Sequence, residues 1–142
     1  MTMVNNLGRR VVTLTDGIAM VVTDLHGDWE RYRWYRNTFL AAYRRGKVQY
    51  LIIVGDLIHR ESSPDQDKSL EMVLDVLDLQ DKYPEAIYYL CGNHELPHIY
   101  HITLAKGDYL YTPYFETRLG EHRTRILSRF QAMPFYVRTP SG

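Results

Sequence analysis

The sequence lacks the features of a secreted, membrane-bound or charge-driven protein. It has a single cysteine, Cys91, so no disulfide can form within the chain, which fits a reducing compartment. No apolar run approaches the length of a membrane span, and the polar N-terminus lacks the apolar core of a signal peptide. With 17 basic and 17 acidic residues, no net charge recruits nucleic acid or an anionic membrane. We therefore expect a soluble, cytoplasmic protein with no membrane partner, and nucleic acid is a disfavoured partner.

The composition is that of one folded domain. A chain of 142 residues with 45% apolar residues can bury a core without disulfides or metals as staples. We expect this domain to comprise residues 9–142 and residues 1–8 to form a flexible N-terminus.

Strand and helix patterns alternate along the chain. Two β-branched runs at residues 11–14 and 18–23 flank a Thr-Asp-Gly turn, which predicts a hairpin. Further along, the patterns predict a helix from Asp28 to Gly46, a strand at 50–54, a helix at 67–82 and a strand at 86–91. This order predicts an α/β fold with a mostly parallel sheet and flanking helices. Beyond it we expect a loop at 103–112, a helix at 113–132 weakened by Gly120, and a last strand at 135–139.

Each of the three predicted parallel strands runs into a polar cluster. The clusters read Asp24-Leu25-His26-Gly27-Asp28, Gly55-Asp56-Leu57-Ile58-His59-Arg60 and Gly92-Asn93-His94-Glu95. Ligands of open parallel sheets bind at the carboxyl ends of strands, so we expect these clusters to converge. Asp24, His26, Asp56 and Asn93 offer carboxylate, imidazole and amide donors, a mixture that suits Mn, Fe, Co or Zn better than Ca.

The ordered motifs DLHGD, GDLIHRE and GNHE resemble those of the calcineurin-like metallophosphoesterase superfamily, and GNHE is closest to its phosphoprotein phosphatase branch. The resemblance implies an αββα sandwich, of which this chain would form the N-terminal half. It implies two divalent metal ions, with manganese favoured, bound by Asp24 and His26, bridged by Asp56 and completed by Asn93. The implied reaction is hydrolysis of a phosphomonoester, in a phosphoprotein or a small molecule, by a hydroxide held between the two ions.

The resemblance also implies catalytic roles. His94 matches the family's catalytic histidine, and Arg60 matches the arginine that holds the phosphate. At the position of His59 the phosphatase branch usually has an aspartate that orients this histidine, and Glu61 and Asp28 are candidates to replace it. A histidine here is instead similar to the GDLFH motif of the superfamily's nuclease branch, so we include His59 among the catalytic candidates and keep a phosphodiesterase or nuclease as the alternative function.

Later family motifs have no match in this chain. The family's further histidine ligands come from a strand ending in HGG or HAG and from a GHx motif, whereas His98, His101 and His122 match no family ligand. We therefore expect an N-terminal fragment that is inactive or weakly active by itself. Its uncovered apolar sheet face favours a homo-oligomer, and a catalytically inactive binding module is the third hypothesis.

Overall fold

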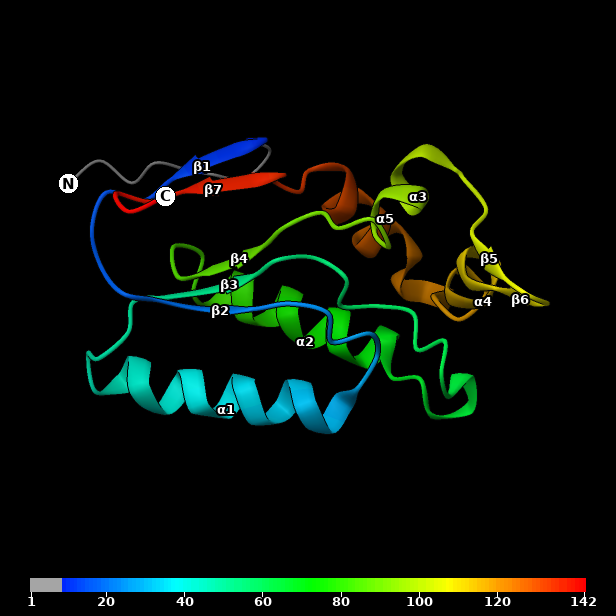
Figure 1. Cartoon of the computed structure of the whole chain (residues 1–142), viewed down its shortest axis with the longest axis horizontal. Coiled ribbons are helices and arrows are strands. Elements are labelled where there is room, and N and C mark those ends of the chain that lie inside the picture. Colours follow the sequence, from blue (N-terminus) through cyan, green and yellow to red (C-terminus); the bar gives the residue numbers. More distant parts are fainter. Residues whose placement is uncertain (1–8) are drawn as a thin grey trace.

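The computed structural model describes residues 9–142, so the prediction for residues 1–8 lies outside the described part of the chain. A parallel sheet with β3 in the middle forms its centre (Figure 1). The strands are β2 (Ala19–Val22), β3 (Tyr50–Ile53) and β4 (Ile87–Tyr89). The crossover helices α1 (Trp29–Arg44) and α2 (Ser69–Lys82) both cover the same face of this sheet. This is the α/β fold that the alternating patterns predict.

Helix α1 begins and ends where its sequence predicts. The Asp28 carboxylate caps the helix by accepting a hydrogen bond of 3.1 Å from the backbone N–H of Arg31. Tyr32, Phe39 and Leu40 lie on one face of the helix and are buried against the sheet. The helix ends at Arg44, and Gly46 follows its cap with a φ of +68°, which favours glycine. Burial of this apolar stripe, rather than helix propensity alone, holds α1 in place.

A polar contact joins the two crossover helices. The Tyr32 hydroxyl donates to Asp75 Oδ2 at 2.5 Å, and Arg36 Nε donates to the same oxygen at 2.6 Å. Asp75→Asn is expected to lower the free energy of unfolding by about 1–3 kcal/mol, because a charge-assisted acceptor of the buried tyrosine is lost. Urea denaturation measures this change. Asp78→Asn, which removes an exposed partner of Arg125, is the control and is expected to cost less than about 0.5 kcal/mol. Equal losses in both variants would contradict the assignment.

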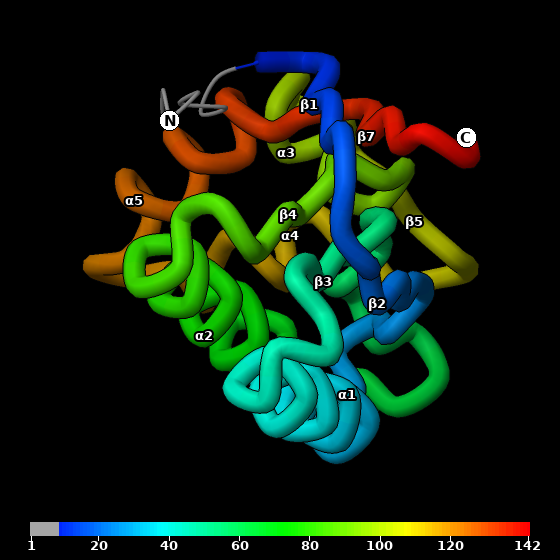
Figure 2. Tube along the Cα trace, turned by 90° about the vertical axis from the view of Figure 1, so that its left-hand side faces the viewer, coloured from blue at the N-terminus to red at the C-terminus, as the bar shows by residue number. Residues whose placement is uncertain are grey.

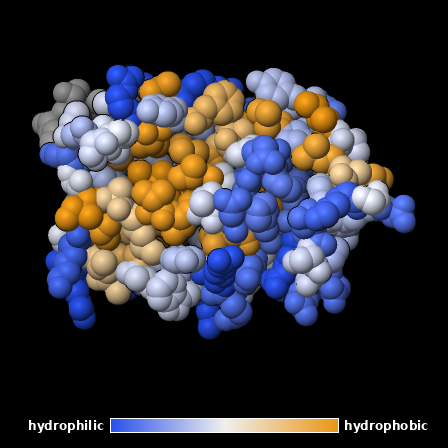
Figure 3. Space-filling view, viewed as in Figure 1, coloured by the Kyte–Doolittle hydropathy of each residue, from blue (hydrophilic) through white to orange (hydrophobic). Residues whose placement is uncertain are grey.

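The opposite face of the central sheet is covered by a separate two-stranded layer. Strand β1 (Val11–Thr13) pairs in parallel with β7 (Tyr136–Arg138), and Figure 2 shows both strands on the side away from α1 and α2. Val12 and Leu14 pack against Ile52 of β3. The predicted hairpin is therefore wrong, because burial on this sheet face outweighs the local turn signal. In Figure 3, apolar side chains gather between the β1–β7 pair and the central sheet.

The segment between β4 and β7 is more broken than predicted. Its elements are α3 (Leu96–Tyr100), β5 (Ala105–Lys106), β6 (Tyr109–Leu110), α4 (Tyr111–Glu116), the 3-10 turn Gly120–His122 and α5 (Arg123–Gln131). The predicted helix at 113–132 is wrong as one element, because Gly120 adopts a φ of +51° and separates α4 from α5. The predicted loop at 103–112 carries the short antiparallel pair β5–β6. Among the described residues, no helix is both long enough and apolar enough to cross a membrane.

Candidate metal centre

The loops that follow β2, β3 and β4 meet at the carboxyl edge of the central sheet. The backbone N–H of His26 donates to the Asp56 carbonyl at 3.0 Å, which ties the first loop to the second. The backbone N–H of His94 donates to Asp56 Oδ1 at 3.0 Å, which ties the third loop to the second. The predicted convergence of the three polar clusters is therefore confirmed, and Asp56 lies at its centre because β3 is the middle strand.

The backbone of these loops is held in an unusual conformation. Asp24, His26, Asp56 and His59 have φ values of +57°, +42°, +54° and +70°. Positive φ costs a non-glycine residue about 1–3 kcal/mol, and such residues cluster at functional sites. Gly55 is required where two loops approach, because a Cβ there would overlap the backbone of Gly92. The fold thus maintains strain in the same loops that carry the polar side chains.

The predicted metal ligands come together in these loops. The ligand atoms of His26, Asp56 and His94 lie within 4.8 Å of one another. Asp24 Oδ1 lies 3.3 Å from His26 Nε2 at the exposed side of the cluster. The Asn93 amide lies against the Asp56 carboxylate, and its nitrogen donates to the two carboxylate oxygens at 3.1 and 2.7 Å. This donor set fits a divalent transition metal.

The partner of His94 differs from both predicted candidates. Its Nδ1 lies 2.8 Å from Nδ1 of the buried His59. Glu61 instead accepts from the Tyr111 hydroxyl and from Lys106, and Asp28 caps α1. Neither candidate therefore takes the place of the usual aspartate beside His94, because other donors already bind both carboxylates.

Arg60 lies at the side of the cluster. Its Nη1 is 3.7 Å from Asp28 Oδ1, beside the first loop. The long separation indicates a weak ion pair, and no other ion pair of Arg60 occurs among the described residues. Its guanidinium therefore keeps donors for an incoming anion.

Burial and hydrogen bonding set the charge states of the site. The Thr23 hydroxyl donates to Asp24 and lowers the pKa of that carboxyl group, which keeps it ionised. Burial lowers the pKa of His59 to about 2. Burial also lowers the pKa of His94, although the Asp56 carboxylate opposes this effect. Near pH 7, Asp24 is therefore ionised and His59 and His94 are neutral, the forms that bind metals and carry protons.

Glu95 is a functional residue that sequence reasoning missed. Its fully buried carboxylate accepts hydrogen bonds from the backbone N–H groups of Asp56 at 2.9 Å, Leu57 at 2.9 Å and Gly92 at 3.0 Å, and from the Tyr89 hydroxyl at 2.8 Å. Glu95 thus connects the second and third loops. The sequence offered one signal for this role: an acidic residue directly follows Asn93 and His94, in the loop after a buried strand.

The three remaining histidines separate into two groups. His98 is buried and contacts His59 and Glu116. His101 is exposed at the end of α3, and His122 lies 3.6 Å from Glu121 at the surface. His101 and His122 therefore lie at the surface, whereas His98 belongs to the interior beside His59.

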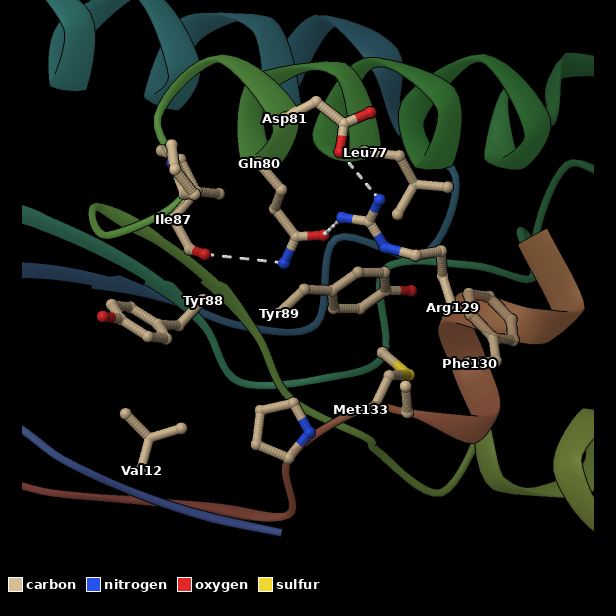
Figure 4. Close-up of a pocket in the computed structure, with 13 residues that line it drawn as sticks. Val12, Leu77, Gln80, Asp81, Ile87, Tyr88, Tyr89, Arg129, Phe130 and Met133 are labelled. Atoms are coloured by element: carbon tan, nitrogen blue, oxygen red, sulfur yellow. Dashed lines mark hydrogen bonds and ion pairs between the residues drawn. The ribbon is translucent and has the colours of Figure 1, made fainter. Parts of the chain in front are cut away.

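A separate cavity of about 290 Å³ lies between α2, β4 and α5 (Figure 4). Tyr89, Phe130 and Met133 form much of its apolar wall. Arg129 crosses it and donates to Asp81 Oδ1 and Gln80 Oε1, both at 2.8 Å. None of the predicted metal or catalytic residues lines this cavity, so it is distinct from the candidate metal centre.

Comparison with known families accounts for this arrangement. The family model described as calcineurin-like phosphoesterase matches residues 19–138, from the first residue of β2 to the last residue of β7, and includes all three loops. The chain belongs to the calcineurin-like phosphoesterase family. This is a family of metal-dependent phosphoesterases, which places the chain among hydrolases of phosphate esters in general. No curated protein matches the chain.

Proposed function

We propose that this calcineurin-like phosphoesterase hydrolyses phosphomonoesters, of a phosphoprotein or a small molecule, with two divalent metal ions. The observation that carries the proposal is the meeting of His26, Asp56 and His94 within 4.8 Å, with Asp24 and Asn93 beside them. We assign Asp24 and His26 to one ion, Asn93 to the other and Asp56 to both. Manganese is the preferred ion, because carboxylate and amide oxygens dominate this donor set.

The side chains around this centre bind the phosphate and transfer the proton. When bound, the two ions supply the Lewis acidity that makes water a nucleophile at neutral pH. Arg60 binds the phosphate, because a planar guanidinium can donate two hydrogen bonds to it at once. The ring nitrogen of His94 that His59 does not use takes a proton from the attacking water and passes it to the leaving oxygen, a step that contributes typically about 10²–10⁴ in rate.

The position of His59 supports a monoesterase over the nuclease alternative. A nuclease-like role needs His59 to reach the substrate, but its side chain is only 1% exposed and lies behind His94. We therefore assign His59 to the support of His94 rather than to phosphate binding.

Model substrates test this proposal. The protein loaded with Mn²⁺ is expected to hydrolyse 4-nitrophenyl phosphate faster than bis(4-nitrophenyl) phosphate and to lose activity when EDTA removes the metal. Release of nitrophenol followed by absorbance measures both rates. Asp78→Asn, an exposed change on α2, is the matched control and is expected to leave both rates unchanged. Faster hydrolysis of the diester would establish the nuclease alternative, and absence of both Mn²⁺ binding and hydrolysis would establish the binding module.

A further inference from the structure

A row of three histidines and a carboxylate leads from the candidate metal centre into the core. His94 Nδ1 lies 2.8 Å from His59 Nδ1, and His59 Nε2 lies 2.9 Å from His98 Nε2. His98 Nδ1 lies 3.3 Å from Glu116 Oε1. The four residues come from the loops after β4 and β3, from α3 and from α4, so the row joins two motif loops to a part of the chain outside all three motifs.

The far end of this row is shielded from water. His98 Nδ1 and Glu116 Oε1 are both buried, and neither makes a hydrogen bond of good geometry within the described residues. The two atoms lie 3.3 Å apart, and because buried polar atoms rarely lack partners, we infer that each is the partner of the other. Tyr111 stacks on His59 with ring centres 5.5 Å apart, and Phe115 packs on His98 at 4.8 Å. Aromatic rings therefore exclude water that could otherwise replace a member of the row.

The carboxylate fixes the direction of every hydrogen bond in the row. A neutral imidazole has one N–H and one bare nitrogen, so a ring between two ring neighbours donates one hydrogen bond and accepts the other. An ionised Glu116 only accepts, so His98 carries its proton on Nδ1 and presents a bare Nε2. His59 must then donate from Nε2 and accept at Nδ1. His94 consequently donates from Nδ1, which leaves its Nε2 bare towards the metal centre.

We propose that Glu116, acting through His98 and His59, fixes the tautomer and orientation of His94. The three residues are positioning residues, and the row replaces a carboxylate in direct contact with His94. This inference rests on the proposed function, in which His94 handles the proton of the leaving group. It gives α3 and α4 a role in the chemistry although neither helix supplies a group to the metal centre.

Removal of the acceptor tests this row. Glu116→Met keeps the length of the side chain but leaves His98 Nδ1 without an acceptor, so kcat for 4-nitrophenyl phosphate is expected to fall by about 10- to 100-fold with KM unchanged. Glu116→Gln retains an acceptor oxygen and is expected to recover part of this loss. Glu121→Met is the control, because Glu121 and His122 form a similar pair at the surface and the change is expected to leave kcat unaltered.

Combining Glu116→Met with a second substitution, His59→Asp, shows whether Glu116 acts by positioning His94 or by a general effect on the structure. In His59→Asp a carboxylate oxygen can take the place of Nδ1 beside His94, and aspartate tolerates the φ of +70° at this position. Glu116→Met is expected to have no effect on kcat in the His59→Asp background, because His94 then has its own carboxylate. Equal losses of kcat in both backgrounds would overturn the proposal.

A spectroscopic measurement keeps this inference separate from the proposed function. In the wild-type protein, the ¹⁵N shifts of the His94 ring are expected to show a proton on Nδ1, and Glu116→Met is expected to shift the population towards the other tautomer. An unchanged tautomer in this variant would overturn the positioning role. A wild-type protein that shows the Nδ1–H tautomer but hydrolyses no phosphate ester would refute the proposed function and leave the row intact.

Discussion

Asp56→Asn is expected to reduce hydrolysis of 4-nitrophenyl phosphate by about 10³-fold or more. Asp56 follows the central strand, its carboxylate contacts His94 and Asn93 of the third loop, and its backbone carbonyl accepts from the His26 N–H of the first loop. Its loss removes the charge shared by both proposed ions, and the several kcal/mol that metal ions contribute to the transition state correspond to this factor. Steady-state kinetics with saturating Mn²⁺ measures the effect, and calorimetry is expected to show weakened Mn²⁺ binding.

The same variant is expected to remain folded. An asparagine at position 56 keeps an oxygen that can accept from the His94 N–H, and the Asn93 amide can turn so that its oxygen accepts from the new NH₂ group. In the absence of metal its Tm is therefore expected to equal or exceed that of the wild type, since strain at functional sites is often relieved by inactivating changes. Asp78→Asn serves as control for both measurements. Wild-type activity in Asp56→Asn would refute the proposed centre.

Glu95→Gln is expected to cause the largest loss of stability, about 3 kcal/mol or more. The buried carboxylate accepts four hydrogen bonds from three backbone N–H groups and one hydroxyl. A glutamine presents an NH₂ group in place of one oxygen, so donors would face donors in a site without water, and buried unsatisfied groups are costly. Urea denaturation measures the free energy of unfolding, with the exposed Glu85→Gln as the control.

The Glu95 variant also has an expected effect on the metal centre. Because Glu95 holds the N–H groups of Asp56 and Gly92, its replacement leaves the second loop tied to the third mainly through the hydrogen bond from the His94 N–H to Asp56. Mn²⁺ affinity is expected to fall together with stability, by about 10- to 100-fold as for other residues that support ligands. A variant with wild-type stability and wild-type Mn²⁺ affinity would show that the four hydrogen bonds do not position the loops.

Patterns within short stretches of the sequence predicted the central sheet and its helices. They did not predict the pairing of β1 with β7, which are far apart in the sequence. The cap at Asp28 and the apolar stripe after it define α1 within the residues of that helix. The pairing of β1 with β7 depends instead on burial of Val12 against Ile52, which no window of neighbouring residues contains. The Thr-Asp-Gly turn before β2 therefore gave a local hairpin signal that the tertiary structure overrode.

As with the fold, the sequence predicted one part of the candidate site and not another. Parallel strands bring their carboxyl ends to one edge, so the meeting of Asp24, His26, Asp56 and Asn93 followed from the order of the strands. The row behind His94 did not follow, because His98 and Glu116 lie on helices whose packing no periodicity indicates. The sequence shows a histidine and a glutamate there and gives no sign that their side chains touch.

The pairing of the first strand with the last implies an order of assembly. Strands β2, β3 and β4 find their neighbours across single helical crossovers, and the loops that hold the polar centre follow those strands. Strand β1 must wait until Tyr136–Arg138 has left the ribosome, because its partner is nearly the whole chain away. The loops of the candidate site can thus form during synthesis. The β1–β7 layer then packs on the central sheet as a late, slow step.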